Sequence, residues 1–144
     1  MVRKVIAVDA SEAMLRASRQ RLEAYGNVEL HRAELEALPL EDRQLDAATL
    51  ILVLHHLPDP AKVISEVARV LKPRGRLLIV DMLPHDRAEY RQEMGHVWMG
   101  FDSKQINNYL KAAGLRLMLY HPLPPDTMAK GPALFAATAT RSSK

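Results

Sequence analysis

An apolar run from Ala47 to Leu54 dominates the hydrophobic pattern, within the segment LDAATLILVLHHLPDP at 45–60. A run of this length is typical of a strand in the middle of a parallel sheet that helices cover on both faces. It ends at His55-His56, and the prolines of Leu57–Pro60 prevent the strand from continuing. Ligands of open α/β sheets bind just beyond the carboxyl ends of central strands. We therefore expect the functional residues around these two histidines.

The chain before this run predicts an alternation of strands and a helix. The helix is amphipathic, and its first turn is capped by Ser11 or by Asp9 in a capping box with Glu12. The predicted elements are a strand over 5–8 that ends on Asp9, a helix from 10–11 to Gly26, a short strand near the sheet edge over 28–31, and a loop over 32–44.

The chain after the run predicts a further helix and strand, and then a hairpin. Leu83–Gly100 is polar with helix-compatible spacings, and we expect it to form a helix or lid over the strand ends. The other predicted elements are a helix from Pro60 capped by Asp59, a turn at 72–75, a strand over 76–82, a helix through Ala113 that Asp102 caps with Gln105 three residues on, and antiparallel strands over 115–121 and 133–139. This order predicts an α/β fold with a parallel sheet.

Composition narrows the class of protein. The 144 residues, 48% hydrophobic and 26% charged, suit one globular domain over 1–140 with a tail over 141–144. The absence of cysteine excludes disulfides and thiolate sites and suits a cytoplasmic location. No apolar run approaches the roughly 20 residues that span a bilayer. The net charge of +3 is scattered, which does not favour nucleic-acid binding, and no metal-ligand spacing is present.

Five segments carry a family resemblance: VIAVDASEAML, ELEALPL, LDAATLILVLHHLPDP, VARVLKPRGRLLIVD and FDSKQINNYLKAAGL. In this order they resemble the class I S-adenosylmethionine-dependent methyltransferases, and within them the small-molecule enzymes of ubiquinone and menaquinone synthesis. The stretch LPHDRAEYRQEMGHVWMGF is similar to methyltransferase domains fused behind an arsenic-repressor-type winged helix. The resemblance implies a Rossmann-like methyltransferase sheet with a C-terminal antiparallel hairpin, and S-adenosylmethionine as cofactor.

The chain departs from the family at its beginning. The family starts with a strand that runs into a glycine-rich turn, whereas the six glycines here stand apart at 26, 75, 95, 100, 114 and 131. We therefore expect the first strand and helix to be missing, in a fragment, one piece of a split protein or a truncated relative. In the family that strand lies between the strands at 5–8 and 47–54. Since unpaired edges are costly, we expect these strands to pair with each other, in a homo-oligomer, or with an unseen N-terminal segment.

The resemblance also implies a cofactor site at the ends of the first two strands. Asp9 resembles the acidic residue that accepts hydrogen bonds from the ribose hydroxyls, because a carboxylate offers two oxygens to a diol; its alternative role is a helix cap. Ala10 and Met14 would flank the adenine, although Met14 suits the core equally. Glu34 stands where the family usually has an Asp that binds the adenine amino group, beside the backbone N–H of Leu35; alternatively, Glu34 is a solvated loop charge.

His55 and His56 are the candidate catalytic residues. His55 resembles the position that lines the sulfonium pocket, and His56 would face the acceptor or brace the loop. Histidine can act as a general base near neutral pH, but methyl transfer from a sulfonium mostly needs in-line positioning, so we favour pocket lining over catalysis. The residues expected on the acceptor side are Asp81, His85, Tyr90, His96 and Trp98.

We expect S-adenosylmethionine-dependent methyl transfer to a small-molecule acceptor. The alternative is a non-catalytic methyltransferase-like module or subunit that acts through association, which the missing glycine-rich turn favours. A nicotinamide-binding Rossmann half shares the acidic strand end, but it explains neither HHLPDP nor the terminal hairpin.

Overall fold

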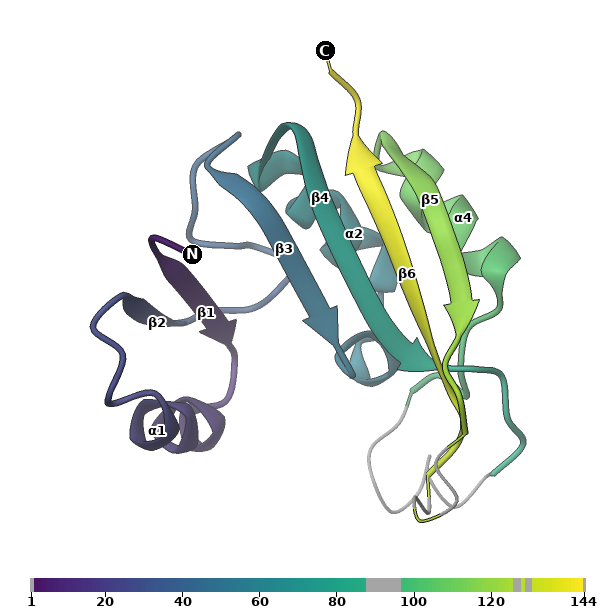
Figure 1. Ribbon diagram of the computed structural model, residues 1–144, viewed down its shortest axis with the longest axis horizontal. Coiled ribbons are helices and arrows are strands. Elements are labelled where there is room, and N and C mark those ends of the chain that lie inside the picture. Colours follow the sequence, from purple (N-terminus) through teal and green to yellow (C-terminus); the bar gives the residue numbers. More distant parts are fainter. Residues whose placement is uncertain (1, 88–96, 126–127, 129–130, 144) are drawn as a thin grey trace. The chain divides into compact units, whose positions relative to one another are not determined.

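The computed structural model describes residues 2–87, 97–125, 128 and 131–143 (Figure 1). The chain divides into two compact units, Met1–Leu40 and Glu41–Lys144. In the described part of the chain, no helix combines the length and the apolar character needed to cross a membrane.

Unit 1–40 is a parallel strand pair with one helix. It consists of β1 (Val5–Asp9), α1 (Glu12–Arg21) and β2 (Val28–Arg32). The register pairs Val5 with Val28 and Asp9 with Arg32, so both strands end at the same edge. Ser11 caps α1 by accepting from the Met14 N–H. The helix ends at Arg21 rather than Gly26, because the chain turns after Leu22, whose carbonyl accepts from the Tyr25 N–H.

Unit 41–144 holds a four-stranded sheet in the order β3-β4-β6-β5. Strands β3 and β4 are parallel, and β6 runs antiparallel to both β4 and β5, which confirms the predicted C-terminal hairpin. The elements are β3 (Leu45–Ile51), η1 (Leu54–His56), α2 (Pro60–Val70), β4 (Leu71–Met82), α4 (Ser103–Ala112), β5 (Leu115–Pro122) and β6 (Leu134–Arg141).

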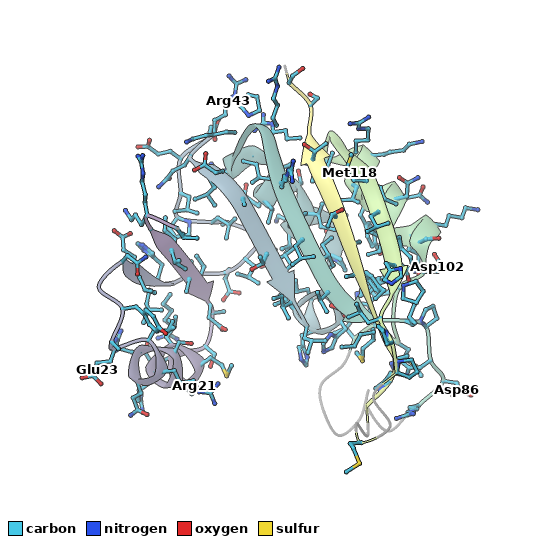
Figure 2. All side chains as sticks on the ribbon, viewed as in Figure 1. Arg21, Glu23, Arg43, Asp86, Asp102 and Met118 are labelled. Carbon is cyan, nitrogen blue, oxygen red and sulfur yellow. The ribbon has the colours of Figure 1, made fainter. Side chains whose placement is uncertain are left out.

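Both helices of this unit cover the same face of the sheet (Figure 1). The predicted caps are confirmed: Asp59 accepts from the Lys62 N–H, and Asp102 forms a capping box with Gln105. Figure 2 labels Asp102 at the start of α4. The core combines buried residues of the helices and of the sheet, among them Ile64, Val67, Ile106, Leu110, Leu77, Ile79 and Phe135.

The prediction that the apolar run forms a central strand is wrong for the described chain. Strand β3 pairs only with β4 there, and among its residues Leu50 alone is buried. Ile51 is 52% exposed. The run also divides: β3 ends at Ile51, and Leu54 already belongs to η1. An apolar run indicates that its side chains avoid water. Whether both faces of the strand are buried depends on neighbouring elements, and the run itself does not provide those elements.

Two ends of the sheet also differ from expectation. Strand β4 begins at Leu71, so the predicted turn at 72–75 is an irregularity within it, with Arg74 at φ 66°. Arg141, expected in the tail, is the last residue of β6. Its guanidinium donates to the carbonyl of Ala68, 2.7 Å away, and to that of Leu71, and so caps the C-terminal end of α2.

Candidate functional site

The chain turns sharply where β3 ends. Leu52 takes a left-handed conformation, φ 57°, and its N–H donates to the Val80 carbonyl at 2.8 Å. The following turn, η1, is anchored by Leu54, which is fully buried. This turn carries His55 back over the neighbouring strand β4 instead of letting it continue along β3.

His55 and Asp81 form a buried pair at this end of the sheet. His55 Nδ1 lies 2.8 Å from Asp81 Oδ1, and the two residues are 4% and 0% exposed. The same oxygen accepts from the backbone N–H of Met82 at 2.8 Å. Within the described residues, Asp81 Oδ2 has no hydrogen-bond partner. When Asp81 is ionised, the proton must lie on Nδ1, which leaves Nε2 of a neutral imidazole as the basic nitrogen.

Residues 97–101 pack against the same turn. The His55 carbonyl accepts from the N–H groups of Val97 and Trp98, at 2.8 and 3.1 Å. The indole Nε1 of Trp98 donates to the Leu57 carbonyl at 2.8 Å, and the Phe101 N–H donates to the Met82 carbonyl at 2.9 Å. This segment is therefore held to η1 and to β4, next to the His55–Asp81 pair.

The other acceptor-side candidates differ in their surroundings. His56 is exposed, and its ring centroid lies 4.0 Å from that of His55. His85 follows β4: its N–H donates to the Met99 carbonyl, and its Nδ1 accepts from the Arg87 N–H. Tyr90, His96 and most of the predicted helix or lid lie outside the described residues.

The candidates for contacts to the ribose and the adenine belong to unit 1–40, whereas His55, the candidate for the sulfonium pocket, belongs to unit 41–144. Asp9 is half-buried at the end of β1, and its Oδ1 accepts from the Ser11 N–H at 2.8 Å. Ser11 is the helix cap, so Asp9 supports the turn before the helix rather than capping it. Ala10 is exposed and Met14 is 56% exposed, which rules out a core position for Met14 within this unit.

Glu34 and Leu35 follow β2 at the same edge of the strand pair. The Ala33 N–H donates to the Asp9 carbonyl at 3.1 Å, which holds the start of this loop beside the end of β1. Glu34 is exposed, and its carbonyl accepts from the Ala37 N–H in a single turn, whereas Leu35 is half-buried. Unit 1–40 therefore brings Asp9 and the loop of Glu34 together at one end.

Burial and charge raise the pKa of two tyrosines that adjoin Phe101. Burial, and next the Asp102 carboxylate, raise the pKa of Tyr120, whose hydroxyl donates to the Phe101 carbonyl at 2.9 Å. Burial, and next Asp59, raise the pKa of Tyr109. Both remain neutral hydrogen-bonding groups around neutral pH. No cluster of three metal-ligating side chains occurs among the residues that the structure describes.

Sequence reasoning named His55 and Asp81 but missed their contact. The signal existed, because both stand at the carboxyl ends of strands predicted to be consecutive and parallel. Nothing in the sequence indicated the left-handed conformation of Leu52, since leucine rarely adopts it. The indole bond of Trp98 to the Leu57 carbonyl also had none, because it joins residues 41 positions apart.

Comparisons with known proteins identify the family. A family model described as a methyltransferase domain matches residues 1–79, more than half of the chain. A 37.1 kDa protein in transposon TN4556 of Streptomyces fradiae is 41% identical over 76 residues, which cover 53% of this chain and 22% of that protein. The ubiquinone/menaquinone biosynthesis C-methyltransferase UbiE of Escherichia coli is 40% identical over 81 residues, or 54% of this chain and 32% of that enzyme.

The fold agrees with this assignment. The solved structure of a SAM-dependent methyltransferase from Aquifex aeolicus superimposes on this chain with a TM-score of 0.75 at 24% sequence identity. The match covers 95% of this chain and 68% of the Aquifex chain. The chain therefore has a Rossmann-like methyltransferase fold and belongs to the methyltransferase-domain family. It spans less than a third of the length of either curated relative.

Proposed function

We propose that this chain contributes to methyl transfer from S-adenosylmethionine to a small-molecule acceptor. Membership of the methyltransferase-domain family supports the reaction class. The observation that carries the proposal is the buried His55–Asp81 pair at the carboxyl ends of two adjacent parallel strands, where α/β folds bind their ligands.

The residues of unit 1–40 suit the nucleoside half of the cofactor. One carboxylate oxygen of Asp9 accepts from the Ser11 N–H. The other oxygen forms no hydrogen bond within the described residues, so it can accept one from a ribose hydroxyl. Met14 offers an exposed apolar side chain, and Leu35 a backbone N–H in the adjoining loop. When bound, S-adenosylmethionine supplies an electrophilic methyl group on a sulfonium. The glycine-rich turn that would approach its methionine half is not in the sequence.

His55 acts as the base of the site in this proposal. Asp81 holds Nδ1 and orients the ring, so that Nε2 is the nitrogen able to take a proton from an acceptor hydroxyl or amine. Asp81, fully buried, is then a positioning residue and not a direct acceptor contact. The pair favours this role over the simple pocket lining that the sequence favoured.

The acceptor side consists of residues that adjoin the pair. Trp98 is held against η1 through its indole and its backbone, and His85 is held to residues 97–101 through its N–H. Trp98 would present an aromatic surface to a small organic acceptor. We keep His56, Tyr90 and His96 as further candidates for this side.

Completion of the sheet is part of the proposal. Within the described residues, β1 pairs only with β2, and β3 only with β4, which leaves one edge of each strand open. Open edges readily pair with added strands. We infer that the strands that pair with these open edges come from a second copy of the chain or from a segment outside the described residues. A solution mass from light scattering that stays monomeric at all concentrations would exclude the second copy.

Calorimetric titration of S-adenosylhomocysteine tests the cofactor site. We expect binding that is lost in Asp9→Ala and retained in Glu12→Ala, a matched removal of an exposed acid three residues away. Absence of binding to the folded chain, or equal binding by both variants, would contradict the assignment of Asp9.

Methyl transfer to a panel of phenols and amines, followed with a labelled methyl group, tests the base. His55→Gln should retain cofactor binding and lose about 10²–10⁴-fold in rate. His121→Gln is the control at an exposed histidine of β5, and it should lose much less. An equal loss in both variants would overturn the assignment of His55.

A further inference from the structure

The backbone from Trp98 to Phe101 touches both sides of the His55–Asp81 pair. The Trp98 N–H donates to the His55 carbonyl at 3.1 Å, and the Phe101 N–H donates to the Met82 carbonyl at 2.9 Å. The Met82 N–H in turn donates to Asp81 Oδ1, the oxygen that His55 Nδ1 contacts. The segment and the pair therefore form one closed ring of hydrogen bonds, in which the position of the segment affects how the imidazole meets the carboxylate.

Tyr120 of β5 holds this segment from the other side. Its hydroxyl donates to the Phe101 carbonyl at 2.9 Å, and its ring stacks on that of Phe135, with the centroids 4.6 Å apart. Strands β4 and β5 both run antiparallel to β6, so Tyr120 lies at the same end of the sheet as Asp81 (Figure 1). Because burial and the Asp102 carboxylate raise the pKa of Tyr120, its hydroxyl keeps its proton and remains a donor.

The Phe101 carbonyl depends on this hydroxyl. Phe101 is fully buried, and in the described part of the chain no other group donates to its carbonyl. A buried carbonyl that loses its donor is costly, so the backbone shifts until another donor or water reaches it. The shift cannot be toward Leu83, because the backbone is already so close that a Cβ at Gly100 would lie 2.2 Å from the Leu83 carbonyl oxygen. Removal of the hydroxyl therefore loosens the segment from β4.

We propose that Tyr120 is a positioning residue for the base of the site. Its hydroxyl fixes Phe101, and through the ring of hydrogen bonds it holds His55 against Asp81 with the proton on Nδ1. This inference rests on the methyl transfer proposed above, in which His55 is the base. Tyr120 acts on the orientation of the imidazole and not on the cofactor, whose ribose and adenine candidates belong to unit 1–40.

NMR of the histidine rings tests this inference without any substrate. Long-range correlation of ring protons with ¹⁵N distinguishes the Nδ1–H tautomer of a neutral imidazole from the Nε2–H tautomer, and the signals that disappear in His55→Gln belong to His55. We expect the Nδ1–H tautomer alone in the wild-type chain, because Asp81 accepts from that nitrogen. In Tyr120→Phe, which keeps the ring on Phe135, we expect a mixture of both tautomers.

Tyr109→Phe is the matched control. The Tyr109 ring also contacts Phe101, with centroids 6.2 Å apart, but its hydroxyl forms no hydrogen bond within the described residues. This variant should keep the wild-type tautomer. Val67→Ala controls for a general loss of stability, because it removes buried methyl groups of α2 and leaves the Tyr120 hydroxyl in place. It should keep the wild-type tautomer as well.

The methyl-transfer assay separates positioning from binding. Tyr120→Phe should lower kcat about tenfold and leave the affinity for S-adenosylhomocysteine unchanged. Tyr109→Phe should change neither quantity. A wild-type chain that transfers no methyl group would refute the proposed function, and the tautomer of His55 would still decide the role of Tyr120.

Three results would overturn the role of Tyr120. They are a single Nδ1–H tautomer in Tyr120→Phe, both tautomers already in the wild-type chain, and the same mixture in either control variant. Circular dichroism shows that each variant has folded before its spectrum is compared. A lower stability of Tyr120→Phe with an unchanged His55 spectrum would identify the hydroxyl as purely structural.

Discussion

His55 Nδ1 and Asp81 Oδ1 lie 2.8 Å apart although 26 positions separate the residues in the chain. The parallel pairing of β3 with β4 brings the ends of both strands to one edge, and the turn at Leu52 folds His55 back over β4. The local backbone thus creates a contact that neither segment specifies alone.

Replacement of Asp81 by Asn should lower the free energy of unfolding by about 1–3 kcal/mol. The amide keeps an acceptor for Met82 and His55, but it places two N–H donors where Oδ2 has no partner in the described chain. Urea denaturation measures the change. Asp46→Asn, at a 89% exposed carboxylate paired with Lys72, should change stability by less than about 0.5 kcal/mol. Equal effects of the two substitutions would contradict a structural role for the pair.

Leu52→Asn should raise the free energy of unfolding by up to about 1 kcal/mol, because asparagine tolerates φ 57° better than leucine does. Leu52 is 42% exposed, so the loss of its buried apolar surface offsets part of this gain. Leu119→Asn, at a comparably exposed position within β5, is the control and should not stabilise. Destabilisation by Leu52→Asn in thermal or urea unfolding would show that this turn is not strained.

Gly100→Ala should displace residues 97–101. Gly100 has φ 93°, and an added Cβ would lie 2.2 Å from the Leu83 carbonyl oxygen. We expect a loss of about 2 kcal/mol or more. Trp98 is the single tryptophan of the chain, so its fluorescence reports directly on this segment. Gly26→Ala, with nothing within 4 Å of the added Cβ, should leave emission and stability nearly unchanged.

Stability should fall as the pH rises above about 10. Burial and Asp102 raise the pKa of Tyr120 above its ordinary value, and burial and Asp59 do the same for Tyr109. A raised pKa in the folded state means that the native chain binds more protons than the unfolded chain in this range. The stabilising contribution of the two tyrosines is therefore fully present at pH values below their ordinary pKa. It declines as the pH rises from there through the pKa of the folded state.

Phenylalanine substitution separates the two tyrosines in that pH titration. Tyr120→Phe keeps the ring that stacks on Phe135 at 4.6 Å and removes the titrating hydroxyl. Its unfolding free energy should depend less steeply on pH above 10, and that of the double variant with Tyr109→Phe less steeply still. An unchanged slope in both variants would assign the alkaline transition to other groups.

The sequence by itself determined most of the local structure. The capping box of Asp102 with Gln105, the cap of Asp59 before Pro60, and the terminal hairpin were all predicted and confirmed. Each depends on residues a few positions apart, or on a periodicity within one element. The family marks were equally local, and the family model that matches residues 1–79 confirms the family that they indicate.

Only the tertiary structure decided how these elements share their surfaces. The Ala47–Leu54 run indicated burial on two faces, yet β3 has one neighbour among the described strands and exposes Ile51. The His55–Asp81 contact likewise depends on strand order and register, and so does the placement of Arg76 and Arg116 on either side of Thr140. Periodicity states which side of an element avoids water, whereas register and strand order determine what lies against it.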